Sequence, residues 1–434
     1  RLAKRMLGHY APEPDPMFWP AGMLLLGMSE YLRMTQRAGS KADPAVRQTV
    51  QEAVEAHVDR WTARGSRLVW IDDVLAGAGL AGMAELTGEG RDYNACDRMF
   101  AFASGSRKDP AGGVVYRPGR AHEEVLADGV GQMALFLSRY AAIRPEKAEE
   151  ALAMAGQQLT VFRRFCFDRA SGLPVHGYEM IGAEALHQNA RNAGAGGAVE
   201  DAGLQEGGAL RGEARQAAEE QQADQTGIWR KGLTGWGRAV GWYMMGLAGY
   251  LAAVADGGRI VTDGHTDCLL AIVESYRRPD GMFPWCFPVT QNYVGSEGGG
   301  EGPAPDASGQ SGAGQVRHAA LDSNSVVAAE LSGFEQGRNR ESAGGLPVDC
   351  SATAMISYAE SFLFPASCRQ ARLGGAQAAL LRYTDPEGKV TQTLAECRGF
   401  GDHPQIYGSY PWGQGSVLAF LARMAAPDSE KGQT

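Results

Sequence analysis

One stretch, residues 236–251, constrains the fold of this chain more than any other. It reads WGRAVGWYMMGLAGYL, and its apolar residues recur at the spacing of one helix face. It also carries Gly237 and Gly241, and an interior glycine costs a helix about 1 kcal/mol relative to alanine. Such a helix is expected where another backbone or a ligand approaches very closely.

Five other stretches share this design. Each has an aromatic or acidic residue at or near its start, continues with small residues and ends in an apolar helical run; they occupy residues 19–32, 71–86, 126–140, 349–361 and 412–424. Plainer amphipathic segments lie between them, at residues 44–61, 145–165 and 371–382. The repeat predicts six helical hairpins, each with a glycine-rich inner helix and an ordinary outer helix.

Six inner helices rich in small residues can pack as a ring with the outer helices around it. We therefore expect an all-α fold, an (α/α)6 barrel, with an open α-solenoid as the alternative. Residues 1–10 could supply the outer partner of the first inner helix. We interpret residues 1–434 as a single domain that carries two polar, low-complexity insertions, at about 181–226 and 291–345.

Composition excludes several classes of partner. The net charge of −9 argues against nucleic acid, and no apolar run is long enough to span a membrane. The seven cysteines lack zinc spacing, and their odd number favours free thiols in a reducing, cytoplasmic compartment. The sequence begins at Arg1, so secretion after removal of a signal peptide stays open. No metal-ligand or cofactor motif is present, and we expect no metal, no cofactor and a monomer or weak homo-oligomer.

In a closed ring, the polar and aromatic residues at the starts of the inner helices would converge on one mouth. These residues are Trp19, Asp72, Asp128, Trp236, Arg238, Asp349 and Trp412. Six helix N-termini would point the same way, which favours an anionic ligand. The tryptophans fit stacking platforms for sugars, and each also fits core packing.

Two of these residues are candidates for acid–base chemistry. Asp72 and Asp128 stand at equivalent positions of the repeat, and two carboxylates across a cavity are the minimum for hydrolysis of a sugar. Each also fits a helix cap, and Asp73 is the alternative to Asp72. His176 lies in an expected loop, GLPVHGYE, as either a surface residue or part of a shaped binding loop.

The motifs together carry a resemblance. WGRAVGWYMMGL resembles the signature helix of the unsaturated rhamnogalacturonyl hydrolases, glycoside hydrolase family 105. Further motifs match in the family's order: IDDVLAGAGLAGMAELTG, LADGVGQMALFLSRY, SGLPVHGYE, DGMFPWCFPV, DCSATAMISYA and YPWGQGSVL. The related unsaturated glucuronyl hydrolases share the fold and the chemistry.

The resemblance implies an (α/α)6 barrel that removes a 4,5-unsaturated uronic acid from the non-reducing end of lyase-generated pectin oligosaccharides. An aspartic acid protonates C4 of the enol ether, water adds at C5, and the hemiketal collapses. By motif position, Asp128 is the acid/base and Asp72 the second active-site aspartate. His176, Trp236, Arg238 and Trp242 match substrate-contacting positions, and we add Trp19, Arg117, Asp349 and Trp412 as substrate-binding candidates.

The chain departs from the family pattern at three places. The loop before the acid/base helix offers Tyr116, Arg117 and Arg120 where the family has a basic residue and an aromatic. HGYE places Glu179 where aspartate is common, and Asp349 replaces a glutamate. Two other functions stay open: an inverting glycosidase that uses Asp72 and Asp128 on saturated sugars, and an inactive sugar-binding barrel.

Overall fold

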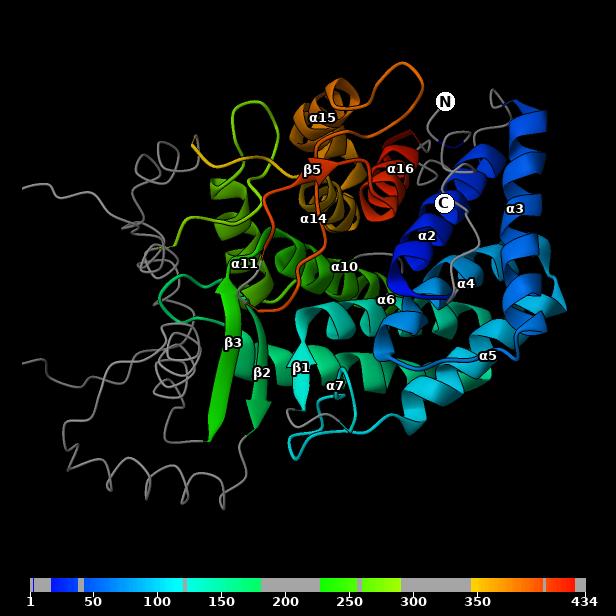
Figure 1. Cartoon of the computed structure of the whole chain (residues 1–434), viewed down its shortest axis with the longest axis horizontal. Coiled ribbons are helices and arrows are strands. Elements are labelled where there is room, and N and C mark those ends of the chain that lie inside the picture. Colours follow the sequence, from blue (N-terminus) through cyan, green and yellow to red (C-terminus); the bar gives the residue numbers. More distant parts are fainter. Residues whose placement is uncertain are drawn as a thin grey trace, which may run out of the picture.

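A computed structural model describes residue 3 and residues 17–37, 43–119, 123–180, 227–255, 260–289, 345–400 and 403–425. The two predicted insertions lie outside the described residues, apart from Gly345, and so does the helix expected from residues 1–10, apart from Ala3. The described part is mainly helical (Figure 1). Among its helices, none combines the length and the apolarity needed to cross a bilayer.

Six inner helices form a closed ring. They are α2 (Trp19–Arg37), α4 (Leu75–Thr87), α6 (Ala127–Ile143), α10 (Gly237–Ala253), α14 (Cys350–Leu363) and α16 (Pro411–Ala425). Each packs against the next, and α16 packs against α2, so the ring has no free end. This closure confirms the predicted barrel and excludes the open solenoid. A short 3-10 helix, η2 (Ile71–Val74), leads into α4.

The outer helices lie around this ring, as Figure 1 shows for α3, α5 and α7. The described chain contains five of them: α3 (Pro44–Ala63), α5 (Gly90–Gly105), α7 (Ala148–Cys166), α11 (Gly264–Ser275) and α15 (Ala366–Arg382). A 3-10 turn, η3 (Pro145–Lys147), precedes α7. The three amphipathic segments predicted as outer helices all fall in these elements.

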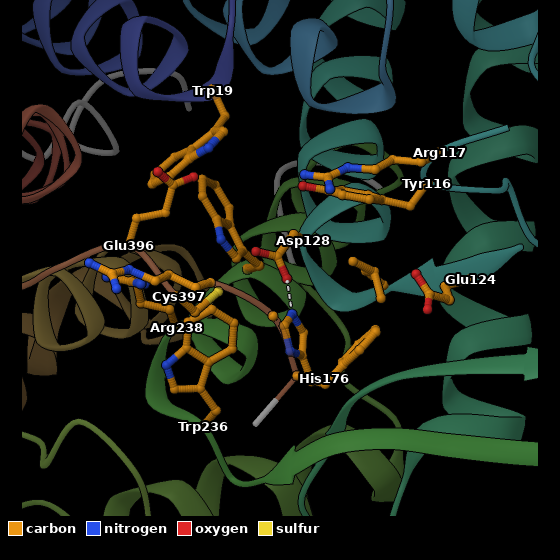
Figure 2. A pocket seen from close by; sticks show the side chains of 15 residues that line it. Trp19, Tyr116, Arg117, Glu124, Asp128, His176, Trp236, Arg238, Glu396 and Cys397 are labelled. Carbon is orange, nitrogen blue, oxygen red and sulfur yellow. Dashed lines mark hydrogen bonds and ion pairs between the residues drawn. The ribbon is translucent and has the colours of Figure 1, made fainter. Parts of the chain in front are cut away.

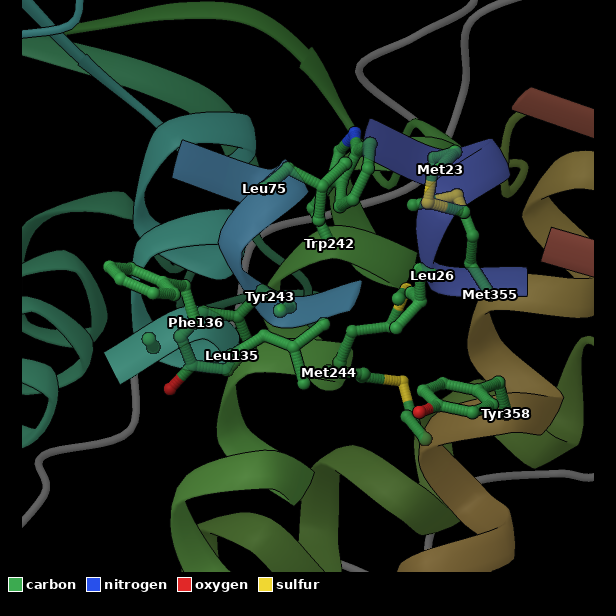
Figure 3. Close-up of a cluster of buried hydrophobic side chains, with 14 of the residues drawn as sticks. Met23, Leu26, Leu75, Leu135, Phe136, Trp242, Tyr243, Met244, Met355 and Tyr358 are labelled. Carbon is green, nitrogen blue, oxygen red and sulfur yellow. The ribbon is translucent and has the colours of Figure 1, made fainter. Parts of the chain in front are cut away.

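The centre of the barrel is filled by side chains from the inner helices, and Figure 3 shows a cluster drawn from α2, α4, α6, α10 and α14. Glycines allow the backbones to approach. A Cβ atom on Gly131 of α6 would collide with the backbone carbonyl of Trp242 on α10. A Cβ on Gly415 of α16 would collide in the same way with the carbonyl of Met23 on α2. The glycines that cost helix propensity therefore permit the ring to close.

The C-terminal halves of the inner helices are joined by a buried polar cluster. Arg139 of α6 pairs with Glu30 of α2, and the hydroxyl of Tyr358 on α14 donates to Glu30 Oε1 at 2.8 Å. Arg139 also donates to the carbonyl oxygen of Ala78 on α4 at 3.0 Å. Burial acts to raise the pKa of Glu30, but Arg139 and two further arginines outweigh it and lower the pKa to about 2. The cluster ties α2, α6 and α14 together in their C-terminal halves and reaches the first half of α4 at Ala78.

Short strands complete the structure at the mouth of the barrel. β1 (Glu124–Leu126), β2 (Val175–Met180) and β3 (Ile228–Thr234) form an antiparallel sheet in that order, and β4 (Thr393–Leu394) pairs with β5 (Tyr407–Gly408). Residues 172–179 were expected to form a loop, and this was wrong for most of them, because residues 175–179 belong to β2. The strand pairs with segments about 50 residues away on either side, so its own pattern did not reveal it.

Gly131→Ala tests the role of close backbone contact. The added methyl group would meet the Trp242 carbonyl, so we expect the free energy of unfolding to fall by about 1–3 kcal/mol. The control is Gly90→Ala at the start of α5, where a Cβ would meet nothing within 4 Å; this variant is expected to stay within about 1 kcal/mol of the unsubstituted protein. Urea unfolding measures both. Equal stability of the two variants would contradict the account of ring closure.

Candidate active site

A cavity of about 400 Å³ lies at the N-terminal ends of the inner helices (Figure 2). Seven of the ten residues predicted for the site line it: Trp19, Arg117, Asp128, His176, Trp236, Arg238 and Trp242. They come from α2, α6, α10, the sheet and the loop before β1, which are far apart in sequence. The convergence of the helix starts on one mouth is what the repeat predicted.

Asp128 lies near the middle of this group in Figure 2. It is the second residue of α6, and β1 runs directly into that helix. Its Oδ2 atom lies 3.1 Å from Nε2 of His176, and its side chain is 16% exposed. The carboxylate is thus open to the cavity while one oxygen is held in place.

His176 is fixed by its surroundings on β2. Its ring centroid lies 4.5 Å from that of Trp236 and 5.1 Å from that of Phe400. Its Nδ1 atom is buried and has no hydrogen-bond partner among the described residues. The neighbouring rings therefore hold the imidazole against Asp128, and the sheet supplies the rigidity that a loop would lack.

Arg238, the second residue of α10, lies beside Trp236. Its guanidinium donates to the carbonyl oxygens of Leu394 at 2.8 Å and Ala395 at 2.9 Å, and it lies 5.0 Å from the ring of Trp236. The guanidinium is buried, but it still lines the cavity. It therefore places a fixed positive charge beside Trp236.

Asp72 does not line the cavity. It is fully buried, and the hydroxyl of Tyr116 donates a hydrogen bond to its Oδ2 atom. Burial raises the pKa of Asp72 well above its ordinary value; the Tyr116 hydrogen bond opposes the shift, and the negative charge of Asp128 adds to it. The alternative, Asp73, accepts hydrogen bonds from the backbone N–H groups of Val69 and Trp70 at 2.7 and 3.1 Å. Asp73 is thus a structural cap.

Asp349 and Trp412 also lie outside the lining of the cavity. Asp349 is the N-cap of α14 and accepts from the backbone N–H of Ser351 at 2.9 Å, from the Ser351 hydroxyl and from the N–H of Leu394 at 3.1 Å. Trp412 donates its indole N–H to the carbonyl of Leu394 and stacks on Tyr410 with centroids 4.7 Å apart. Both residues hold Leu394 in place and do not line the cavity themselves.

One wall of the cavity was not predicted from the sequence. Residues 396–400, Glu-Cys-Arg-Gly-Phe, line the cavity between β4 and β5. Nothing in this short polar segment is periodic, and its place follows from the pairing of β4 with β5. The cluster of charge and glycine just before the last inner helix was the one available signal.

Glu179 belongs to an ion-pair cluster across the sheet. Lys231 of β3 lies 2.7 Å from Glu179 Oε2 and 2.9 Å from Glu124 Oε1. Glu124 lines the cavity, and Lys231 orients its carboxylate. Charges in the lining balance, with three arginines (Arg117, Arg238 and Arg398) and three carboxylates (Glu124, Asp128 and Glu396).

The comparisons with known proteins agree on the architecture. No protein-family model matches the chain, and no curated protein matches it significantly in sequence. Among solved structures, the chain is similar to possible members of GH105 from Klebsiella pneumoniae (14% identity, 98% of this chain and 91% of that chain, TM-score 0.59) and Salmonella enterica (14%, 98% and 92%, 0.60). It is also similar to the unsaturated glucuronyl hydrolase of Bacillus sp. GL1, with 13% identity, 94% and 86% coverage and a TM-score of 0.56.

The fold is an (α/α)6 barrel. At these identities the similarity shows the fold alone, and the chemistry follows from the residues in the cavity.

Among the described residues, no group of three or more His, Cys, Asp or Glu side chains could hold a metal ion. The seven cysteines all lie in the part of the chain that the structure describes, and none of them forms a disulfide bond.

Cys397 offers a test of the cavity's surroundings. Burial raises the pKa of its thiol to about 11, and the negative charge of Asp128 contributes. Because the thiolate is the nucleophile, we expect iodoacetamide at pH 8 to alkylate Cys397 about 100-fold more slowly than an unperturbed thiol. Asp128→Asn should speed the reaction. Peptide mass spectrometry measures the rate, and alkylation at the speed of a free thiol would contradict this geometry.

Proposed function

We propose that this protein is a glycoside hydrolase that removes a 4,5-unsaturated uronic acid from the non-reducing end of an oligosaccharide. The observation that carries the proposal is the placement of Asp128, whose carboxylate faces the cavity while His176 holds one of its oxygens. The motif resemblance and the similarity to the barrels of unsaturated glucuronyl hydrolases support it.

Asp128 supplies both proton transfers of the reaction. In its acid form it gives a proton to C4 of the enol ether, and the positive charge that develops at C5 is shared with the ring oxygen. A water molecule adds at C5 and returns a proton to the Asp128 carboxylate. The resulting hemiketal opens, and the neighbouring sugar leaves with a free hydroxyl group. His176 keeps Oδ2 in one orientation, so the other oxygen can face the substrate.

The cavity also suits the rest of the substrate. The uronate carboxylate needs positive charge, which Arg117, Arg238 and Arg398 provide around the lining. Trp19, Trp236 and Trp242 offer flat apolar surfaces for the faces of sugar rings. We propose an unsaturated galacturonyl unit from rhamnogalacturonan as the substrate, on the strength of the motif resemblance.

The placement of Asp72 argues against an inverting glycosidase that uses Asp72 and Asp128. Such an enzyme needs two carboxylates that face the substrate from opposite sides. Asp72 is fully buried, and the phenol of Tyr116, which lines the cavity, is its hydrogen-bond partner. A base that cannot reach water in the cavity cannot activate it directly.

The test is turnover of an unsaturated galacturonyl–rhamnose disaccharide beside its saturated counterpart. We expect the ultraviolet absorbance of the conjugated C4=C5 bond to disappear and the saturated compound to survive. Asp128→Asn should lower kcat by about 10²–10⁴-fold, because the acid/base is lost. Unsaturated glucuronyl disaccharides serve as the second substrate.

Two other outcomes of this assay would favour a different function. Cleavage of the saturated disaccharide would favour an ordinary glycosidase. Binding of both disaccharides without turnover of any unsaturated substrate would favour a sugar-binding barrel. Either result would overturn the proposed hydration chemistry.

A further inference from the structure

Tyr116 stands between a buried aspartate and the cavity. Its side chain lines the cavity and is 8% exposed, whereas Asp72 behind it is 0% exposed. The phenol donates its proton to Asp72 Oδ2. The other carboxylate oxygen, Oδ1, is buried and has no hydrogen-bond partner among the described residues. Asp72 can therefore influence a bound sugar through the Tyr116 hydroxyl.

The ring of Tyr116 is held in one place. It lies against the start of α6, where a Cβ on Gly129 would come within 3.1 Å of the ring. On the other side, the guanidinium of Arg117 lies 5.4 Å from the Tyr116 ring and 4.5 Å from the ring of Trp70. Figure 2 shows Tyr116 and Arg117 side by side across the cavity from Trp236. A side chain fixed in this way presents its oxygen in one direction.

Building on the proposed function, we propose that Tyr116 contacts the sugar at this wall and that Asp72 is a positioning residue that acts through it. A phenol that donates its proton to a carboxylate keeps lone pairs on its oxygen, so it can accept a hydrogen bond. Tyr116 Oη thus accepts from a hydroxyl group of the bound uronide. Asp72 thereby presents the substrate with the Tyr116 oxygen, a hydrogen-bond acceptor held in one place, instead of its own carboxylate.

The test is a double-mutant cycle with Tyr116→Phe, Asp72→Asn and the double variant, assayed on the unsaturated disaccharide. Loss of a hydrogen bond to the substrate should lower kcat/KM about tenfold, mainly through KM, in each single variant. Because Asp72 acts through the phenol, the double variant should be no worse than Tyr116→Phe. A purely structural role for Asp72 would lower the thermal midpoint without this non-additivity.

The chain contains a matched control. The hydroxyl of Tyr140 also donates to a carboxylate, Asp97 Oδ1 at 2.8 Å, in a tyrosine–aspartate pair that does not line the cavity. Tyr140→Phe removes the same chemical group and should leave KM unchanged. A shift in KM as large as that of Tyr116→Phe would overturn the inference.

The remaining outcomes separate this inference from the proposed function. If the unsubstituted protein turns over the disaccharide and Tyr116→Phe does so equally well, the role of Tyr116 is overturned and the function stands. If Asp72→Asn lowers kcat/KM as much in the Tyr116→Phe background as alone, Asp72 does not act through Tyr116, and its positioning role is overturned. If the unsubstituted protein turns over no unsaturated uronide, the proposed function fails and the inference fails with it.

Discussion

The barrel depends on how closely its inner helices approach one another. At Gly131 and Gly415 there is no room for even one carbon atom, because a carbonyl group of the neighbouring helix occupies the place of a Cβ. Larger residues would push these helices apart and widen the ring. The residues at the helix starts would then separate, and the cavity that they share would be lost. Glycine is thus a requirement of the site as well as of the fold.

The two ends of the ring have different chemistry. Toward the C-terminal halves of the inner helices, Arg139 and Glu30 join helices in a buried ion pair whose other hydrogen bonds come from Tyr358 and Ala78. At the N-terminal end, polar groups face a cavity and are only partly satisfied within the protein. Asp128 is one such group, because His176 Nε2 lies against its Oδ2 atom while its side chain stays 16% exposed in the cavity lining. The barrel therefore combines one side where a buried ion pair joins the helices with another side where polar groups face a cavity that can receive a polar ligand.

Much of the fold and of the candidate site could be predicted from the sequence, because the patterns that indicate a helix are local. The spacing of apolar residues locates each helix in the sequence, and the repeat showed that similar residue types recur at the inner helix starts. Trp19, Asp128, Trp236, Arg238 and Trp242, which lie at or near inner helix starts, consequently line the cavity. His176 and Arg117 also line it, but they lie outside the inner helices and were predicted from their own motif and loop. Asp72, Asp349 and Trp412 were placed at the correct end of the barrel, but their side chains turn away from the lining. Their direction is set by partners such as Tyr116 and Leu394, which are remote in sequence.

The proposed reaction requires Asp128 to deliver a proton to C4 of an unsaturated uronide. Turnover in D₂O, followed by NMR, tests it most directly. If Asp128 protonates C4, the first-formed product carries deuterium at C4 and has no C4=C5 bond, and Asp128→Asn gives no such product. A released uronic acid that keeps its double bond would show cleavage at the anomeric carbon instead, and it would contradict the proposed chemistry.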